Sequence, residues 1–190
     1  MIRGSNGVLL AAAARLGYLE GPVLDLTHGR GSWWTVYTPH ELIIFEGDFT
    51  DTGMVGGCAP IICYDPPYIS TGNRGTSTTP DFYARYGLGE LKGGWRPLRQ
   101  LMSDGLDEAT RILAPGGHLL MKCMNYVEGG HRVWNVPYFV HYGQELGLRL
   151  VDEFIHLSGG GPQVMTNLDG SPRQQQHTRQ VHSNLLVFTK

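Results

Sequence analysis

The chain has 190 residues, of which 41% are hydrophobic and 17% charged, and its formal net charge is −2 at pH 7. We expect one domain over 1–190, because this length is sufficient to bury a sizeable core. The near-neutral charge excludes a globally basic nucleic-acid-binding protein, so any basic surface must be local. The three cysteines have no paired spacing, which predicts neither a disulfide framework nor a metal site. No run approaches the roughly 18 apolar residues of a membrane span. We therefore expect no membrane partner and a reducing, cytoplasmic location.

Short apolar runs alternate with helical periodicities along the chain. In chain order we expect a helix over 7–19, strands over 22–27, 41–48 and 60–65, a helix over 98–113, a strand over 118–124, a helix over 136–148, and strands over 149–157 and 184–190. Two long polar or glycine-rich segments, 69–97 and 158–183, are expected to be loops. This order predicts an α/β fold with a mostly parallel sheet. The final strand–loop–strand predicts an antiparallel hairpin at the C-terminal edge.

The first strand ends in a glycine turn, DLTHGRGS, at 25–32. In open α/β sheets ligands bind beyond the carboxyl ends of the strands, and glycines there let the backbone approach a ligand. The turn lacks both the third glycine of a dinucleotide fingerprint and the Gly-Lys-Ser/Thr of a P-loop. Taken alone, it is equally consistent with an ordinary strand–helix connection.

A second acidic site follows the second strand. Glu46 and Asp48 lie 15 and 17 positions after Gly31. An acid about twenty residues beyond a glycine turn commonly hydrogen-bonds a ribose hydroxyl. Phe49 beside them is placed to contact an adenine ring. The alternative, a solvated acid at a strand end, stays open, as does the choice between Glu46 and Asp48.

The third site is Asp65-Pro66-Pro67-Tyr68, again directly after an apolar strand. Two consecutive prolines end a strand in any protein, since proline stops both helix and ladder. That explanation does not account for the acid and the aromatic ring. Each of these three ligand-type turns could occur by chance, but all three in sequence order at one sheet edge are much less probable by chance than any single one.

In this combination the chain resembles the amino-methyltransferase branch of the S-adenosylmethionine-dependent methyltransferases, which methylate exocyclic nitrogens of adenine or cytosine. In that family an acid-x-x-x-Gly-x-Gly turn binds the cofactor, and an Asp/Asn/Ser-Pro-Pro-Tyr/Phe/Trp turn does the chemistry. The resemblance covers most of the chain and implies a Rossmann-like class I methyltransferase sheet with S-adenosyl-L-methionine as cofactor. The cofactor-binding residues it implies are Asp25, Thr27, Gly29, Gly31, Glu46, Asp48 and Phe49, and the catalytic residues are Asp65, Pro66, Pro67 and Tyr68.

The chemistry of amine methylation explains the third turn. An aromatic amine is a poor nucleophile because its lone pair is delocalised into the ring. The Asp65 carboxylate and the Pro66 carbonyl are two preorganised acceptors for the amine N–H groups, which exposes the lone pair. Tyr68 offers a face on which the target base stacks, worth about 1–3 kcal/mol. A base in duplex DNA must be flipped out to reach this turn.

The chain departs from the family pattern in two ways. Only 40 positions separate Asp25 from Asp65, so an element between them is expected to be reduced, and the aromatic stretch 32–39 does not favour a first helix. There is also no room for a separate target-recognition domain. The two long loops are the expected substitutes, because they interleave basic and aromatic residues. Their candidate substrate-binding residues are Arg74, Arg85, Arg96, Arg173 and Arg179.

Three other residues are given structural roles. We expect the Trp33–Trp34 pair to belong to the core or to an interface, and Lys122 to be structural or on the cofactor side. The predicted function is methyl transfer to a nucleobase amine, with DNA adenine N6 first and cytosine N4 second. The alternatives are an RNA base methyltransferase and a non-catalytic module that binds nucleic acid or activates a partner. The predicted partner is therefore a nucleic acid, and the oligomeric state stays open.

Overall fold

The computed structural model describes residues 1–68, 94–157, 169, 171, 177–178 and 180–190. The strands in this part of the chain are β1 (Ile2–Arg3), β2 (Pro22–Asp25), β3 (Glu41–Ile44), β4 (Ala59–Tyr64), β5 (Leu113–Cys123), β6 (Tyr126–Glu128), β7 (His131–Val133), β8 (Arg149–Leu157) and β9 (His182–Thr189). The helices are α1 (Asn6–Arg15), the 3₁₀ helix η1 (Ser32–Trp34), α3 (Trp95–Ile112) and α4 (Asn135–Glu145).

The described strands form a seven-stranded sheet in the order β1-β8-β9-β5-β4-β2-β3. Strands β3, β2, β4 and β5 are parallel to one another, whereas β9 is antiparallel to both β5 and β8. The predicted α/β fold, mostly parallel with a C-terminal antiparallel hairpin, is confirmed. The two-residue strand β1, which the sequence did not predict, pairs with the outer side of β8.

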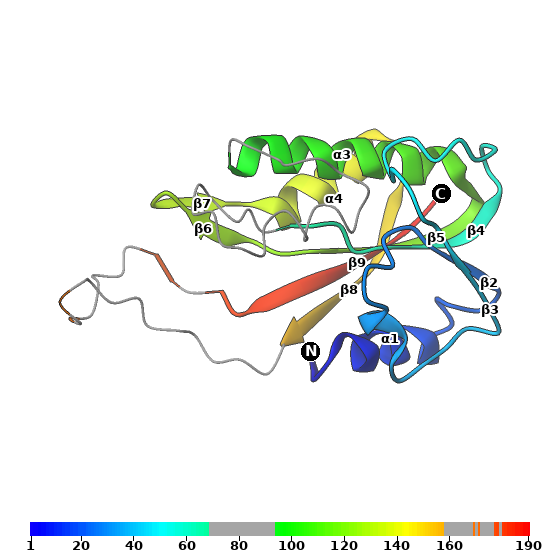
Figure 1. Ribbon diagram of the computed structural model, residues 1–190, viewed down its shortest axis with the longest axis horizontal. Coiled ribbons are helices and arrows are strands. Elements are labelled where there is room, and N and C mark those ends of the chain that lie inside the picture. The colour runs from blue at the N-terminus through cyan, green and yellow to red at the C-terminus, as the bar shows by residue number, and fades with distance from the viewer. Residues whose placement is uncertain (69–93, 158–168, 170, 172–176, 179) are drawn as a thin grey trace.

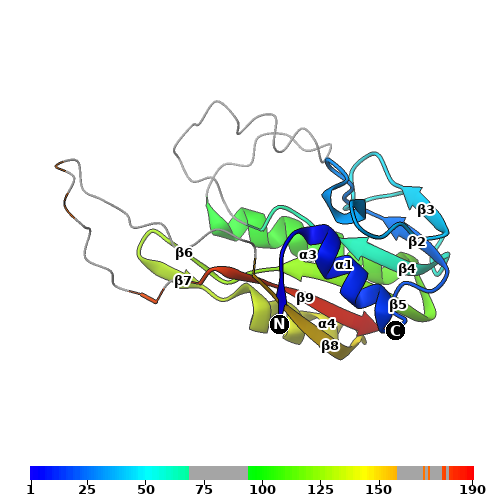
Figure 2. The ribbon, with the colours of Figure 1, turned by 90° about the horizontal axis from the view of Figure 1, so that it is seen from below.

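Helices cover both faces of this sheet (Figure 1). Alternate residues of each strand face opposite ways, so that β5 contributes Leu119 and Met121 to the core under α3 and α4, and Leu120 to the core under α1. Figure 2, from below, shows α1 lying across the sheet on the face opposite α3. The result is the helix–sheet–helix layering that a buried parallel sheet requires.

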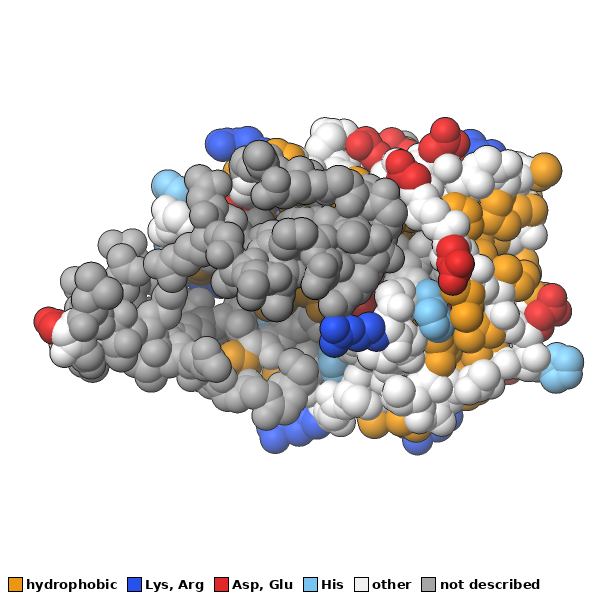
Figure 3. Space-filling model, in the orientation of Figure 1, with side chains coloured by type: hydrophobic (Ala, Val, Ile, Leu, Met, Phe, Trp, Pro, Cys, Tyr) orange, Lys and Arg blue, Asp and Glu red, His pale blue; other side chains and the backbone are white. Residues whose placement is uncertain are grey.

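The connection from β2 to β4 is short, as the sequence suggested. Residues 26–40 hold the single turn η1 and no α-helix, and residues 45–58 hold no further strand. Strand β3 is therefore an edge strand, and it is shorter than the predicted 41–48. Its Ile43 and Ile44 are nearly half exposed. Figure 3 shows hydrophobic side chains gathered at this end of the molecule.

Two boundaries differ from the sequence prediction. Helix α3 begins at Trp95, inside the segment 69–97 that was predicted to be a loop. Pro97 is compatible with this start because the first-turn N–H groups have no partner within a helix. The hairpin β6–β7 was not predicted, although Gly129 and Gly130 between its strands have the positive φ angles of a two-residue turn. The remainder of 69–97 and most of 158–183 lie outside the described residues.

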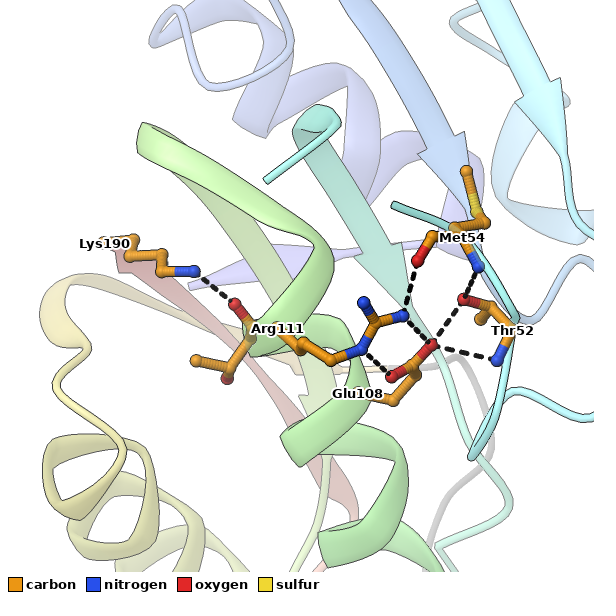
Figure 4. A network of polar contacts seen from close by, with 6 residues as sticks. Thr52, Met54, Glu108, Arg111 and Lys190 are labelled. Atoms are coloured by element: carbon orange, nitrogen blue, oxygen red, sulfur yellow. Dashed lines mark hydrogen bonds and ion pairs between the residues drawn. The ribbon is translucent and has the colours of Figure 1, made fainter. Parts of the chain in front are cut away.

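A polar network fastens the segment after β3 to α3 (Figure 4). The Arg111 guanidinium donates to both carboxylate oxygens of Glu108, at 2.6 and 2.8 Å, and to the Met54 carbonyl at 2.7 Å. The Thr52 N–H donates to Glu108 at 2.9 Å, and its hydroxyl donates to the same carboxylate. These bonds hold the connection that follows the second acidic site against the helix.

No helix in the described part of the chain is long and apolar enough to cross a membrane.

Glu108→Gln should lower the free energy of unfolding by about 1–3 kcal/mol at neutral pH, because charge-assisted hydrogen bonds are lost. The hydrogen bond from Arg111 lowers the pKa of Glu108 to about 2. A carboxyl with a depressed folded-state pKa stabilises the protein above its unfolded pKa and loses this effect as pH falls. Denaturation curves should therefore show wild type and variant converging between about pH 4.5 and pH 2.

The matched control is Glu145→Gln, whose carboxylate is 58% exposed beside His141 and should contribute little. If Glu108→Gln and Glu145→Gln have the same small effect at pH 7, the network does not fasten this segment.

Candidate active site

The first and third sequence turns meet at the carboxyl edge of the sheet. Strands β2 and β4 are neighbours, and Asp25 at the end of β2 pairs in register with Cys63 of β4. Asp65 follows the end of β4, and its N–H donates to the Thr27 hydroxyl at 2.6 Å. The glycine turn and the Asp-Pro-Pro-Tyr turn are thus directly bonded, although 40 positions separate their acids.

Asp25 organises the glycine turn. Its carboxylate is 4% exposed; Oδ1 accepts the Thr27 N–H at 3.1 Å, and Oδ2 lies 2.9 Å from His28 Nδ1. The Trp34 indole N–H donates to the same Oδ2 at 2.6 Å. Burial raises the pKa of Asp25, and the hydrogen bonds from Trp34 and His28 oppose that rise. The Asp25 carboxylate therefore holds the glycine turn in place through hydrogen bonds with Thr27, His28 and Trp34.

The backbone of this turn suits the close approach of a ligand. Gly29 and Gly31 have φ angles of 56° and 68°, in the left-handed region that favours glycine. A side chain at position 31 would also meet the His28 ring, since an added Cβ would lie 3.0 Å from its Nε2. The turn thus carries no side chain at two places where the backbone lies beyond the strand end, which fits the cofactor turn implied by the resemblance.

The three residues of the second acidic site have different environments. Glu46 is exposed, two residues beyond the end of β3. Asp48 accepts the Thr50 N–H at 2.9 Å and the Thr50 hydroxyl at 2.6 Å, which makes it a turn residue. Phe49 is 1% exposed in the core. An added Cβ at Gly105 of α3 would lie 2.6 Å from its ring, so the helix packs closely against it. The structure thus leaves Phe49 no open face for an adenine.

Asp65 has one occupied and one unoccupied carboxylate oxygen. The Trp33 indole N–H donates to Oδ2 at 2.7 Å. Oδ1 is shielded from solvent and has no hydrogen-bond partner among the described residues; the Lys122 ammonium is 3.8 Å away. Burial raises the pKa of Asp65, and the Lys122 charge and the Trp33 bond oppose that rise. The Asp65 side chain is 21% exposed. Its Oδ1 can accept a further hydrogen bond, because a carboxylate oxygen has two lone pairs.

The buried Lys122 lies between Asp65 and Tyr68. The residue is 4% exposed, and its ammonium donates to the Asn6 Oδ1 at 2.9 Å and lies 5.4 Å from the centroid of the Tyr68 ring. A cation at this distance from a ring face is attracted by its quadrupole. The sequence prediction left its role as structural or cofactor-side. The structure places it beside Asp65 and Tyr68 of the predicted catalytic turn, which is compatible with a structural role.

Strands from the C-terminal hairpin complete the surroundings of Tyr68. Pro66 and Pro67 are buried and Tyr68 is partly buried. Burial raises the pKa of Tyr68, and a hydrogen bond with Ser183 at the start of β9 opposes that rise. Ser183 in turn lies 3.3 Å from Nδ1 of the buried His156 on β8. The ring is therefore anchored from two strands that lie far from it in the sequence.

The sequence prediction missed the role of the tryptophan pair. Trp33 is 4% exposed, as expected for the core, but both indole N–H groups point at acids of the site. A signal for this was present: a buried indole N–H needs an acceptor, and this pair follows the glycine turn directly. What the sequence could not show is which acceptor each ring would reach.

Of the five candidate substrate-binding arginines, only Arg96 lies within the described residues. It is exposed on the first turn of α3, with its guanidinium 4.7 Å from the centroid of the Trp95 ring. Arg99, which the sequence prediction did not select, packs on the same ring and on Tyr138. The other four lie outside the described residues: Arg74, Arg85, Arg173 and Arg179. Among the residues that are described, no group of three or more metal-ligating side chains could hold a metal ion.

Comparisons with known proteins agree with this architecture. No protein-family model matches the sequence, and no curated protein matches it either. A solved S-adenosylmethionine-dependent methyltransferase from Archaeoglobus fulgidus is similar, with 11% identity and a TM-score of 0.52, over 98% of this chain and 95% of that one. Another from Leishmania major has 10% identity and a TM-score of 0.50, over 96% and 70% of the two chains.

A candidate DNA modification methylase from Thermus thermophilus has 12% identity and a TM-score of 0.44, with 89% of this chain aligned. The present chain spans only 52% of that protein's length. At such identities the likeness concerns the fold. The chain has the mostly parallel, Rossmann-like sheet of the S-adenosylmethionine-dependent methyltransferases.

Proposed function

We propose that this protein transfers a methyl group from S-adenosylmethionine to an exocyclic amine of a nucleobase, with DNA adenine N6 as the first candidate target. The observation that carries the proposal is Asp65, in an Asp-Pro-Pro-Tyr turn that is hydrogen-bonded to a glycine turn at the same sheet edge. One oxygen of its carboxylate accepts no hydrogen bond from the described residues. The methyltransferase fold supports it, because in open α/β sheets ligands lie beyond the carboxyl ends of the strands.

The cofactor would lie on the glycine turn and the end of β3. Gly29 and Gly31 leave the backbone open, Asp25 and Thr27 support the turn, and an acid beyond β3 would take the ribose. Of the two acids we favour Glu46, because it is exposed whereas Asp48 is committed to Thr50. When bound, the cofactor supplies an electrophilic methyl group on a sulfonium.

The chain's own residues would prepare the amine. Asp65 and the Pro66 carbonyl each accept one amine N–H, so that the nitrogen lone pair is turned out of conjugation. No protein nucleophile would be needed, because the amine nitrogen would bond to the methyl carbon as the carbon–sulfur bond breaks. S-adenosylhomocysteine would be the leaving group, and the amine proton would be released with Asp65 as the nearby acceptor. The Tyr68 ring would offer the stacking face for the base.

Other targets fit the same turn. Cytosine N4 has the same amine chemistry, and an RNA base is the next candidate because the site reads an amine rather than a duplex. The different-class alternative is a non-catalytic module that binds nucleic acid or activates a partner. Incubation with labelled S-adenosylmethionine and separate DNA and RNA pools, followed by nucleoside mass spectrometry, distinguishes all of these. The absence of any methylated nucleoside, despite cofactor binding, would overturn the proposal.

Asp65→Ala should reduce turnover roughly a hundred- to thousandfold, as the loss of one preorganised transition-state hydrogen bond does. Asp65→Asn is the matched variant of the same shape. Its single amide oxygen would accept the Trp33 indole N–H and its NH2 would face the amine, so it should also lose turnover. Cofactor affinity, measured by calorimetry with S-adenosylhomocysteine, should change little in either. Full methyl transfer by Asp65→Ala would show that the turn only ends a strand.

Glu46→Ala should weaken S-adenosylhomocysteine binding by about ten- to a hundredfold, the effect of losing a hydrogen bond to a charged group. Asp48→Ala removes a carboxylate of the same charge two residues away and should lower stability slightly while leaving the affinity near wild type. Calorimetry on both variants decides between the two acids. The reverse result would assign the ribose contact to Asp48.

Arg96→Ala should weaken nucleic-acid binding and reduce the slope of log affinity against log salt by about one, the signature of one lost phosphate contact. Its control is Arg149→Ala, because Arg149 is also exposed but lies at the opposite edge of the sheet. Arg149 of β8 pairs with Thr189 of β9, which pairs with His118 near the amino end of the parallel strands. If the slope of log affinity against log salt is the same for Arg96→Ala, Arg149→Ala and wild type, the start of α3 is not part of the nucleic-acid-binding surface.

A further inference from the structure

The two tryptophans after the glycine turn each serve a different acid of the site. Trp33 donates to Asp65 Oδ2 at 2.7 Å, and Trp34 donates to Asp25 Oδ2 at 2.6 Å. We infer that Trp33 is a positioning residue for methyl transfer: it holds one oxygen of Asp65 so that the other is kept for the substrate amine. This inference rests on the proposed function and adds a residue to it.

The geometry leaves Trp33 little freedom to do otherwise. It is 4% exposed, packs in the core on the α1 side of the sheet and belongs to the short helix η1. Asp65 is held at two points, at its N–H by Thr27 and at Oδ2 by the indole. A carboxylate fixed in this way cannot rotate to exchange its two oxygens without breaking the indole bond.

The second oxygen of Asp65, Oδ1, has the Lys122 ammonium as an ion-pair partner but accepts no hydrogen bond from the described part of the chain. This oxygen is shielded from solvent. A shielded acceptor without a hydrogen bond is unfavourable, and the N–H of a bound amine would satisfy it. Lys122 does not fill this position, because its ammonium is 3.8 Å from Oδ1 and is hydrogen-bonded to Asn6. The indole thus determines which oxygen is available.

Trp33 also acts on the charge of Asp65. In the described part of the chain, the titratable groups that interact with this carboxylate are Asp25 on β2, Cys63 on β4, Tyr68 in the turn itself, Lys122 and Cys123 on β5, and His156 on β8. Burial and Asp25 raise the pKa of Asp65, whereas Lys122 and Trp33 lower it. Loss of the indole donor therefore raises that pKa further, and the acid limb of a pH–rate profile moves to higher pH.

The test compares Trp33→Phe with Trp34→Phe, which remove one indole N–H each and keep an aromatic ring. Trp33→Phe should lower kcat about ten- to a hundredfold, shift the acid limb upward and leave S-adenosylhomocysteine affinity at the wild-type value. In Trp34→Phe the cofactor affinity should be the more affected quantity, because its partner Asp25 supports the glycine turn. Thermal unfolding checks that both variants are folded.

A second measurement uses the unaltered core and needs no activity. In protein labelled with ¹⁵N-tryptophan, the Trp33 indole N–H resonance should follow the titration of Asp65 and should shift in Asp65→Asn, while that of Trp34 should not. A folded Trp33→Phe with wild-type kcat and an unchanged acid limb overturns the inference, as does a Trp33 resonance that ignores Asp65. A wild-type protein that methylates no nucleobase overturns the proposed function instead, and the resonance still reports on the contact.

Discussion

A carboxylate removed from water keeps its charge only where hydrogen-bond donors or a cation replace the water. The carboxyl edge of this sheet holds two such groups, Asp25 and Asp65, at the ends of neighbouring strands. Both receive an indole N–H from the single 3₁₀ turn η1. The two indole–carboxylate hydrogen bonds therefore fix the position of η1 relative to Asp25 and Asp65, and with it the path of the chain between β2 and β3.

The rest of the N-terminal half is arranged around that turn. The connections on both sides of β3 hold no α-helix and no further strand, and β3 is an exposed edge strand beside β2. The segment after it is fastened to α3 by Glu108 and Arg111, and by the packing of Phe49 against the helix at Gly105. These contacts hold the connection between β3 and β4 against α3, although it contains no helix or strand of its own.

The C-terminal half lies on the other side of the Asp-Pro-Pro-Tyr turn. Lys122 from β5, Ser183 from β9 and His156 from β8 surround Asp65 and Tyr68, because the antiparallel strand β9 lies between β5 and β8 and brings its start to the same sheet edge. The beginning of α3 presents Arg96 on Trp95 to solvent. The acids proposed for the cofactor and the arginine proposed for the substrate thus come from different parts of the chain.

The pattern of the sequence was sufficient for the alternation of strands and helices, for the parallel sheet, and for the two turns with Asp25 and Asp65, since these depend on local periodicity and on residue types at fixed spacing. Local pattern did not reveal that Phe49 is core, that Gly129 and Gly130 turn a hairpin, or that Pro97 lies in a helix. Nor could it show the partners of Trp33, Trp34 and Lys122. Each of these depends on contacts between segments distant in the chain, and only the packing of the sheet decides which donor meets which acceptor.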